Sequence, residues 1–260
     1  MFEEFTLEAT AVDVIAEWLG LPRGWQPFDV LPAATTVDER RAYAGEVWRW
    51  LRAEGMVDRD RIDADVEAAF RVWAVPEVLV VVRAEQDFDP PHVLYRAAAA
   101  GELGVFSEQL GEDIRFQLLK ADGLIDHVVG MLPRHQALPV RPHSVVVGGT
   151  APAVGDGDEP ELPSLAEQAR RYDQRNQEGV RAFARWPVTL CGGYELHLRE
   201  QDALRHVGTM QFFDTEQGRY LVNDEPLGAG RRRLDFVPSD GSHLRRWLHE
   251  EVAFARRGGR

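Results

Sequence analysis

The chain has one cysteine, Cys191, which is by residue type its strongest candidate nucleophile. His197 follows six residues later as a possible base, and Gly192 and Gly193 could offer backbone donors to an oxyanion. Residues six apart on one strand are roughly 20 Å apart, which is too far for proton transfer. We therefore interpret Cys191 as a buried structural residue. A lone cysteine forms no intramolecular disulfide, which fits a reducing compartment.

The other residue types that could carry catalysis or bind metal are scattered. The carboxylates of residues 156–161 miss the spacing of a calcium loop, so we interpret them as a solvated acidic linker. His243 and His249 lie on one predicted helix but on different faces, which does not suit a metal site. Motifs for nucleotide binding, serine hydrolysis and zinc proteolysis are missing from the sequence. We expect no enzymatic activity, no cofactor and no metal.

An aromatic residue in a polar turn is the best candidate for contact with a partner. Phe88 lies between Asp87 and Asp89 in the segment from Glu85 to Pro91, between two predicted strands. Such a residue either folds back onto the body of the protein or is offered to a partner. We take Phe88, Asp87 and Asp89 as candidate partner-binding residues, with the carboxylates attracting a basic surface.

Composition and charge limit the class of protein. The chain has 260 residues, of which 44% are apolar and 28% charged, as in a globular protein. Its 43 acidic residues against 30 basic ones give a net charge of -13, which argues against nucleic acid or an anionic membrane as the partner. The apolar run from Val78 to Val82 is too short to cross a bilayer, and the acidic N-terminus is unlike a secretory signal. We expect a cytoplasmic protein.

Hydrophobic periodicity predicts helices followed by strands in residues 1–133. Helices are expected over residues 7–19, 37–54 and 61–75, with Thr36 capping the second. A short strand is expected at residues 28–31, and four more at 77–84, 92–99, 104–109 and 113–119. A helix over residues 121–132 closes this N-terminal half. Residues 134–163, rich in proline, are predicted to be a linker with a brief extended segment at 144–147.

The same order of elements returns in residues 164–260, the predicted C-terminal half. A helix of about 20 residues from Ser164 precedes strands at 188–199, 207–213, 219–223 and 232–237, and a last helix begins near Ser239. The string Ala-Phe-Arg-Val-Trp-Ala-Val at 69–75 is matched by Ala-Phe-Ala-Arg-Trp-Pro-Val at 182–188. We interpret this as an internal duplication with quasi-two-fold symmetry, although similar modules can also look alike without one.

Several strings, in their order and spacing, resemble the EspG family of type VII secretion chaperones of actinobacteria. The first is Thr-Val-Asp-Glu-Arg at 36–40, and the next are Leu-Arg-Ala-Glu-Gly-Met-Val-Asp at 51–58 and Phe-Arg-Val-Trp-Ala-Val-Pro-Glu-Val at 70–78. The sharpest is Phe-Asp-Thr-Glu-Gln-Gly-Arg-Tyr-Leu-Val at 213–222, preceded by Gly-Gly-Tyr at 192–194. We interpret Gly218 and Tyr220 in it as structural. The likeness covers nearly the whole chain.

The resemblance implies an α+β fold with a central, mostly antiparallel sheet flanked by helical bundles, in two similar halves. It also implies a cytosolic chaperone that binds secreted helical proteins such as PE–PPE heterodimers and keeps them soluble for export. Family members often have a longer loop where residues 85–91 are short here, so the identity of the substrate stays open. The alternatives are a hydrolase, which should show a pocket with converging titratable groups, and a small-ligand-binding regulator.

Overall fold

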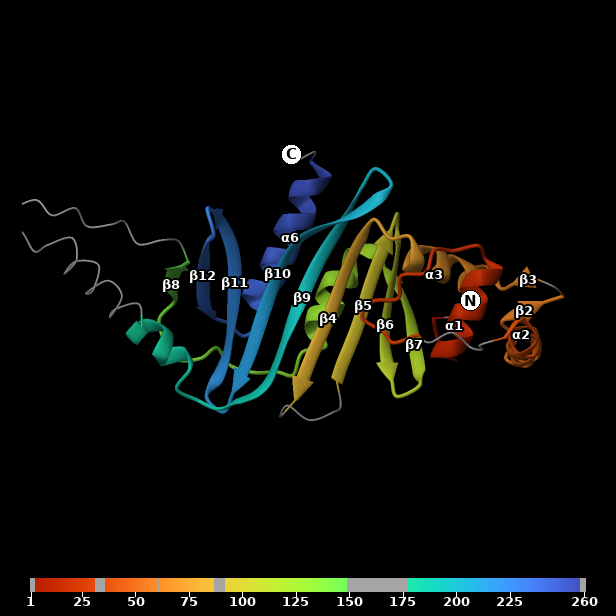
Figure 1. Ribbon diagram of the computed structural model, residues 1–260, viewed down its shortest axis with the longest axis horizontal. Helices are drawn as coiled ribbons and strands as arrows, with labels where there is room; N and C mark the ends of the chain where they lie inside the picture. Colours follow the sequence, from red (N-terminus) through yellow and green to blue (C-terminus); the bar gives the residue numbers. More distant parts are fainter. Residues whose placement is uncertain (1–2, 31–35, 60, 87–91, 149–176, 258–260) are drawn as a thin grey trace, which may run out of the picture.

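The computed structural model describes residues 3–30, 36–59, 61–86, 92–148 and 177–257. Within these residues one ten-stranded antiparallel sheet runs through the whole molecule, in the order β1-β7-β6-β5-β4-β9-β10-β11-β12-β8. Helices cover parts of both faces, so the fold is α+β as predicted (Figure 1). The two-stranded ribbon β2–β3 stands apart from this sheet.

The N-terminal half contributes the strands at one end of the sheet and most of the helices. Its elements in chain order are β1 (Glu4–Glu8), α1 (Ala9–Trp18), α2 (Val37–Ala53), β2 (Val57–Asp58), β3 (Arg61–Ile62), α3 (Ala64–Ala74), β4 (Val78–Gln86), β5 (His92–Ala100), β6 (Leu103–Leu110), β7 (Asp113–Lys120), the short 3-10 helix η1 (Ala121–Gly123) and α4 (Leu124–Gly130). Thr36 caps α2 as expected: its side chain accepts from the Glu39 amide, and the Glu39 carboxylate accepts from the Thr36 amide.

The C-terminal half contributes the other end of the sheet. Its elements are β8 (His143–Val147), a helical segment at residues 177–183, β9 (Val188–Glu200), β10 (Ala203–Thr215), β11 (Gly218–Gly228), β12 (Arg231–Pro238) and α6 (Ser242–Arg256). The expected start of the long helix at Ser164 lies outside the described residues. The extended segment expected at 144–147 is β8, an edge strand of the sheet. The division into 1–133, a linker at 134–163 and 164–260 stays a prediction.

Both halves follow the same path through the sheet. The inner strands β4 and β9 pair with each other, and the order β4-β5-β6-β7-β1 on one side is matched by β9-β10-β11-β12-β8 on the other. In each half the edge strand comes first in the chain and pairs antiparallel with the last strand: β1 pairs with β7, and β8 pairs with β12. This strand order agrees with the predicted duplication. Superposition of the two halves in space stays a prediction.

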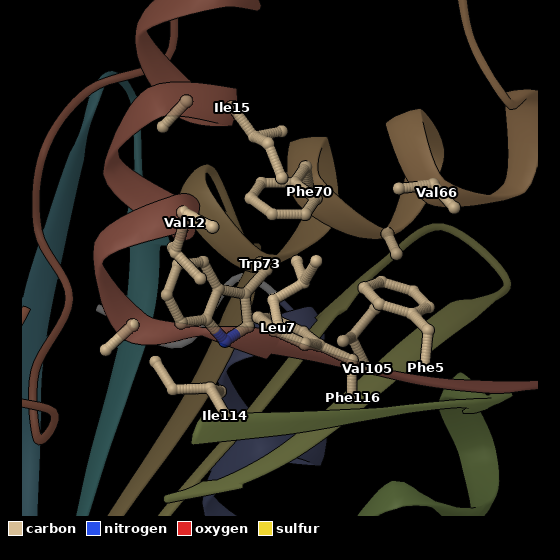
Figure 2. Packing of buried hydrophobic residues seen from close by; sticks show 14 of the residues in the cluster. Phe5, Leu7, Val12, Ile15, Val66, Phe70, Trp73, Val105, Ile114 and Phe116 are labelled. Atoms are coloured by element: carbon tan, nitrogen blue, oxygen red, sulfur yellow. The ribbon is translucent and has the colours of Figure 1, made fainter. Parts of the chain in front are cut away.

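Three apolar clusters bind the helices to the sheet. Alternate residues of β4 serve opposite faces: Leu79 and Val81 join a cluster with α1, α2 and α3, whereas Val80 and Val82 join one with α4 and α6. Figure 2 shows the first cluster, in which the rings of Phe70 and Trp73 on α3 lie above Phe116 on β7. The third cluster packs Phe183 of the 177–183 helix against β11.

The N-terminal predictions need three corrections. The helix expected from Leu7 begins at Ala9, because the alternating segment Glu4–Glu8 pairs with β7 instead. Residues 28–30 form no strand; Phe28 is buried in the first cluster, and Leu31 lies outside the described residues. The third helix begins at Ala64 rather than Arg61, since the Asp63 side chain caps it by accepting from the Asp65 amide.

Candidate partner-binding surface

The three candidate residues Asp87, Phe88 and Asp89 lie outside the described residues, so their role stays a prediction. The strands that lead into and out of their turn are described. Glu85, near the end of β4, is exposed and lies opposite Cys191 of β9, and the start of β5 is half-buried at Val93. The turn therefore leaves the sheet next to the boundary between the two halves.

A polar strip crosses the centre of the sheet on the side of the α1–α3 cluster. We define the polar strip as Arg83 on β4, Glu195 and His197 on β9, and His206 and Thr209 on β10. Antiparallel register places these side chains on one face, because residues directly opposite each other on neighbouring strands point the same way. Glu195 is opposite Thr209, His197 is opposite His206, and Arg83 is opposite Gly193.

Short contacts join the side chains of the polar strip. Arg83 Nη1 donates to Glu195 Oε1 at 2.7 Å, and the other oxygen of Glu195 lies 3.5 Å from His197 Nε2. The rings of His197 and His206 meet edge to face at 5.2 Å, and His206 Nε2 lies 2.9 Å from Thr209 Oγ1. Arg83 and Glu195 keep 43% and 32% of their side-chain surface exposed, so both charges can reach a partner.

The electrostatics of the polar strip leave one partly exposed ion pair that can meet a partner. Burial lowers the pKa of His197, and the neighbouring His206 lowers it further, while Glu195 raises it. The imidazole is therefore neutral at pH 7. What remains is one ion pair, with a hydroxyl and two imidazole rings beside it, which can contact polar groups of another protein. Among the described residues, no group of three or more histidine, cysteine, aspartate or glutamate side chains could hold a metal ion.

Cys191 fits its structural interpretation. Its side chain is partly buried on β9, and burial raises the pKa of the thiol, with the charge of Glu85 adding to the increase. The thiol is therefore protonated at pH 7 and a weak nucleophile. His243 and His249 lie on α6, where His249 faces Asp126 of α4 at 3.4 Å and His243 faces Arg246.

The string at 213–222 is a buried hairpin between β10 and β11. Asp214 and Arg219, 4% and 1% exposed, form a two-pronged ion pair in which Nε donates to Oδ1 at 2.5 Å and Nη2 to Oδ2 at 2.7 Å. Gly218 has a φ of 150°, and a Cβ there would lie 2.6 Å from Leu138 Cα, so only glycine fits. Tyr220 is buried against Phe183. The sequence reasoning found the glycine and the tyrosine but missed the ion pair.

The comparison with known families agrees with the resemblance of the sequence strings. The EspG family model matches residues 8–250, which is nearly the whole chain. This chain belongs to the EspG family. Among solved structures it is similar to the Mycobacterium tuberculosis type VII secretion system chaperone EspG5, in a complex with the PE25-PPE41 dimer. The TM-score is 0.64 at 12% identity, covering 95% of this chain and 94% of EspG5. No curated protein matches the sequence.

The sequence strings that resemble the family lie where they stabilise the fold of this chain. Thr36 opens α2, the string at 70–78 runs from α3 into β4, and Asp214 and Arg219 hold the β10–β11 hairpin. In this chain these residues stabilise the fold through a helix cap and a buried ion pair. None of the described helices is long and apolar enough to cross a membrane.

Proposed function

We propose that this EspG-family protein is a cytoplasmic chaperone that binds helical substrates of a type VII secretion system, similar to PE–PPE dimers, and keeps them soluble until export. The observation that carries the proposal is the family match over residues 8–250. The similarity in fold to EspG5, a type VII secretion system chaperone whose structure is of a complex with the PE25-PPE41 dimer, supports it over 95% of the chain. A binding role without catalysis agrees with the protonated, weakly nucleophilic Cys191.

The substrate surface in this proposal is the Glu85–Pro91 turn together with the polar strip. β4 ends three residues after Arg83, whose charge is accessible beside Glu195. Phe88 would supply apolar area, and burying one phenylalanine contributes roughly 1.5–3 kcal/mol. Asp87 and Asp89 would attract a basic tip of the substrate, an effect that weakens as salt is added.

Co-expression tests the function directly. The chain, carrying an affinity tag, is produced together with a helical secretion substrate pair encoded beside it in the genome, and the soluble fraction is purified. We expect a stable complex on size exclusion with light scattering, and a substrate that precipitates when produced alone. A substrate that is equally soluble without the chain, and that never co-elutes with it, would contradict the proposal.

A pair of variants tests the surface separately from the function. Phe88→Ala should weaken substrate binding about tenfold and leave the melting temperature unchanged. Leu227→Ala is the matched control, because Leu227 is 37% exposed. It lies at the β11–β12 hairpin, at the end of the strands away from the Glu85–Pro91 turn. If Phe88→Ala lowers the melting temperature and leaves affinity alone, Phe88 folds back onto the sheet and is not part of the surface.

A further inference from the structure

The outer edge of β1 is an open strand edge beside a groove. In the part of the chain that the structure describes, β1 pairs with β7 and has no strand on its other side. A groove of about 740 Å³ runs along this edge between β1 and α2, lined by the whole of β1 and by Tyr43, Val47 and Trp50. An open edge next to a helix is the arrangement in which proteins take up an extended peptide as an added strand.

The register shows which backbone groups face the groove. Glu3 accepts from the Leu118 amide at 2.9 Å, and the Ala9 amide donates to Glu112 at 2.8 Å, so the odd-numbered residues of this segment bond to β7. In an antiparallel pair the residues between them point their N–H and C=O groups the other way. The outward-facing groups therefore belong to Glu4 and Thr6, together with the N–H of Glu8, because the Glu8 C=O accepts the first hydrogen bond of α1. Five residues of strand span about 17 Å.

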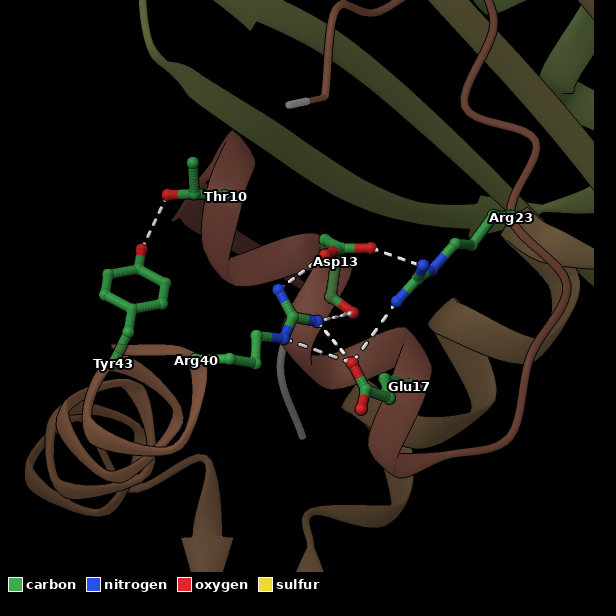
Figure 3. A network of polar contacts seen from close by, with 6 residues as sticks. All are labelled: Thr10, Asp13, Glu17, Arg23, Arg40 and Tyr43. Carbon is green, nitrogen blue, oxygen red and sulfur yellow. Dashed lines mark hydrogen bonds and ion pairs between the residues drawn. The ribbon is translucent and has the colours of Figure 1, made fainter. Parts of the chain in front are cut away.

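A polar network holds α2 in place across the groove (Figure 3). Tyr43 lies 2.6 Å from Thr10 Oγ1 and donates to Glu8 Oε2 at 3.1 Å. Arg40, one turn earlier on α2, donates to Asp13 at 2.6 Å and to Glu17 at 2.5 Å. Three residues of α1 and one of β1 thus fix the helix beside the strand edge. The groove is part of the folded structure rather than a product of binding.

The negative charge of the groove favours a basic segment. Among the described residues, its lining includes the carboxylates of Glu4, Glu8, Glu46, Glu54 and Asp113, and no lysine or arginine. Arg115, outside the lining, lies 3.8 Å from the Glu4 carboxylate. Tyr43, Val47 and Trp50 supply apolar area, and Trp50 is 39% exposed. Because alternate side chains of a strand point to opposite sides, the complementary segment alternates apolar and basic residues.

A second copy of the same edge does not fit. Two β1 strands paired antiparallel about Thr6 would place Glu4 of each directly opposite Glu8 of the other. Like charges at directly opposite positions destabilise a sheet. Charged side chains on an edge strand are also a common protection against edge-to-edge association.

We propose that the groove between β1 and α2 binds an extended basic segment of another protein, which adds to the sheet as a strand beside β1. This surface goes beyond the proposed substrate surface, because β1 is at the edge of the sheet and the Glu85–Pro91 turn is at its centre. The segment pairs with Glu4, Thr6 and Glu8, sets apolar side chains against Trp50, and directs basic side chains to the carboxylates.

The test uses a fluorescent hexapeptide in which arginine alternates with valine, and follows its anisotropy on titration with the full chain. The variant is Thr6→Pro, which removes an outward N–H without removing a bond to β7; proline is tolerated at such edge positions. Thr6→Val is the control, since it keeps the N–H. We expect Thr6→Pro to weaken binding at least tenfold, Thr6→Val to bind as the parent does, and a glutamate–valine peptide to bind at least tenfold more weakly.

Three results would overturn the proposal: no saturable binding of the arginine peptide, equal affinity of the parent and Thr6→Pro, or equal affinity for the glutamate peptide. If Thr6→Pro fails to fold, two N-methylated versions of the peptide replace it, each blocked on alternate amides. Loss of binding for one version alone supports strand addition, and the same affinity for both contradicts it.

A dimer of the chain that Thr6→Pro dissociates would assign the edge to a second copy and reject the basic segment. Unchanged co-purification of the secretion substrate with Thr6→Pro separates this surface from the proposed function.

Discussion

Each half of the sheet buries one arginine, and the two are stabilised differently. Arg219 on β11 is matched by a carboxylate, Asp214, and also donates to Pro133 O at 2.9 Å. Among the residues that the structure describes, the hydrogen-bond acceptors of Arg96 on β5 are all carbonyls, Trp73 O at 2.7 Å and Gln26 O at 2.7 Å, and the Trp73 ring centre lies 5.0 Å from its guanidinium. Burial lowers the pKa of Arg96 to about 10, so it is still charged at pH 7.

The difference follows from what each arginine joins. Arg219 ties the two strands of one hairpin to each other and to the chain after α4, so it serves the sheet itself. Arg96 ties β5 to the end of α3 and to the segment after α1, so it fastens the helical layer onto the sheet. The two halves share a strand order but differ in the helices packed on the sheet. Arg219 therefore stabilises the shared sheet, and Arg96 stabilises the helices that belong to the N-terminal half.

The largest expected effect is the loss of the carboxylate beside Arg219. Asp214→Ala leaves a fully buried guanidinium without its counter-charge, which costs about 3–5 kcal/mol of unfolding free energy. Urea denaturation measures this cost. The double variant Asp214→Leu, Arg219→Met removes both charges, and we expect it to lie within about 1–2 kcal/mol of the parent. If the double variant is as unstable as the single one, packing rather than the unpaired charge explains the loss.

A smaller effect is expected for the arginine that has no counter-charge. Arg96→Met keeps most of the buried volume but leaves Trp73 O and Gln26 O without their donor, at a cost of about 1–3 kcal/mol. Arg199→Met is the matched control, because half-buried Arg199 also donates to a carbonyl, Pro76 O at 2.8 Å, and solvent can replace it. Equal losses for Arg96→Met and Asp214→Ala would remove the distinction between the two arginines.

Sequence periodicity predicted the sheet better than it predicted these contacts. The eight central strands lie within a few residues of their predicted bounds, apart from the longer ends of β10 and β11, because each is an alternating or continuous apolar run bounded by turn residues. β1 was missed because Leu7 and the apolar residues of α1 also fit a helical spacing. The Arg96 contacts join residues 23 and 70 positions apart, which no local pattern encodes. The Asp214–Arg219 pair was missed as well, although its five-residue separation across a tight hairpin is a local signal that could have predicted it.

The helical layer of the N-terminal half should open more easily than the sheet. Only Val47 and Leu51 of α2 are buried, and its start depends on the capping box of Thr36 and Glu39. Thr36→Ala removes the side-chain acceptor and should cost about 1 kcal/mol. We expect hydrogen exchange to quicken in α2 and to stay unchanged in β9–β12. Faster exchange in both regions would mean that the layer and the sheet unfold together.

The smallest expected effect compares the last helix of each half. His127 on α4 and His243 on α6 are both half-buried, and burial lowers the pKa of each ring. Arg115 lowers the pKa of His127 further and Glu108 raises it, while Arg246 lowers that of His243 and Glu250 raises it. An unfolded histidine titrates near 6.5. Below that pH the unfolded chain binds more protons than the folded chain, so stability must fall as the pH falls.

The partners of the two rings predict how their replacement differs. His127 packs its edge on Phe106, and among the described atoms its Nε2 has no partner, whereas His243 Nδ1 lies 2.7 Å from Arg246 Nη2. His127→Leu should therefore leave stability at pH 7 unchanged or slightly higher, and His243→Leu should lower it by a few tenths of a kcal/mol. Both variants should flatten the decline between pH 7 and pH 5, each by less than about 1 kcal/mol because solvent screens half-exposed rings. Thermal melts of the parent and of each variant at pH 7 and pH 5 measure these changes in stability. A decline as steep in both variants as in the parent would place its origin in groups other than these two histidines.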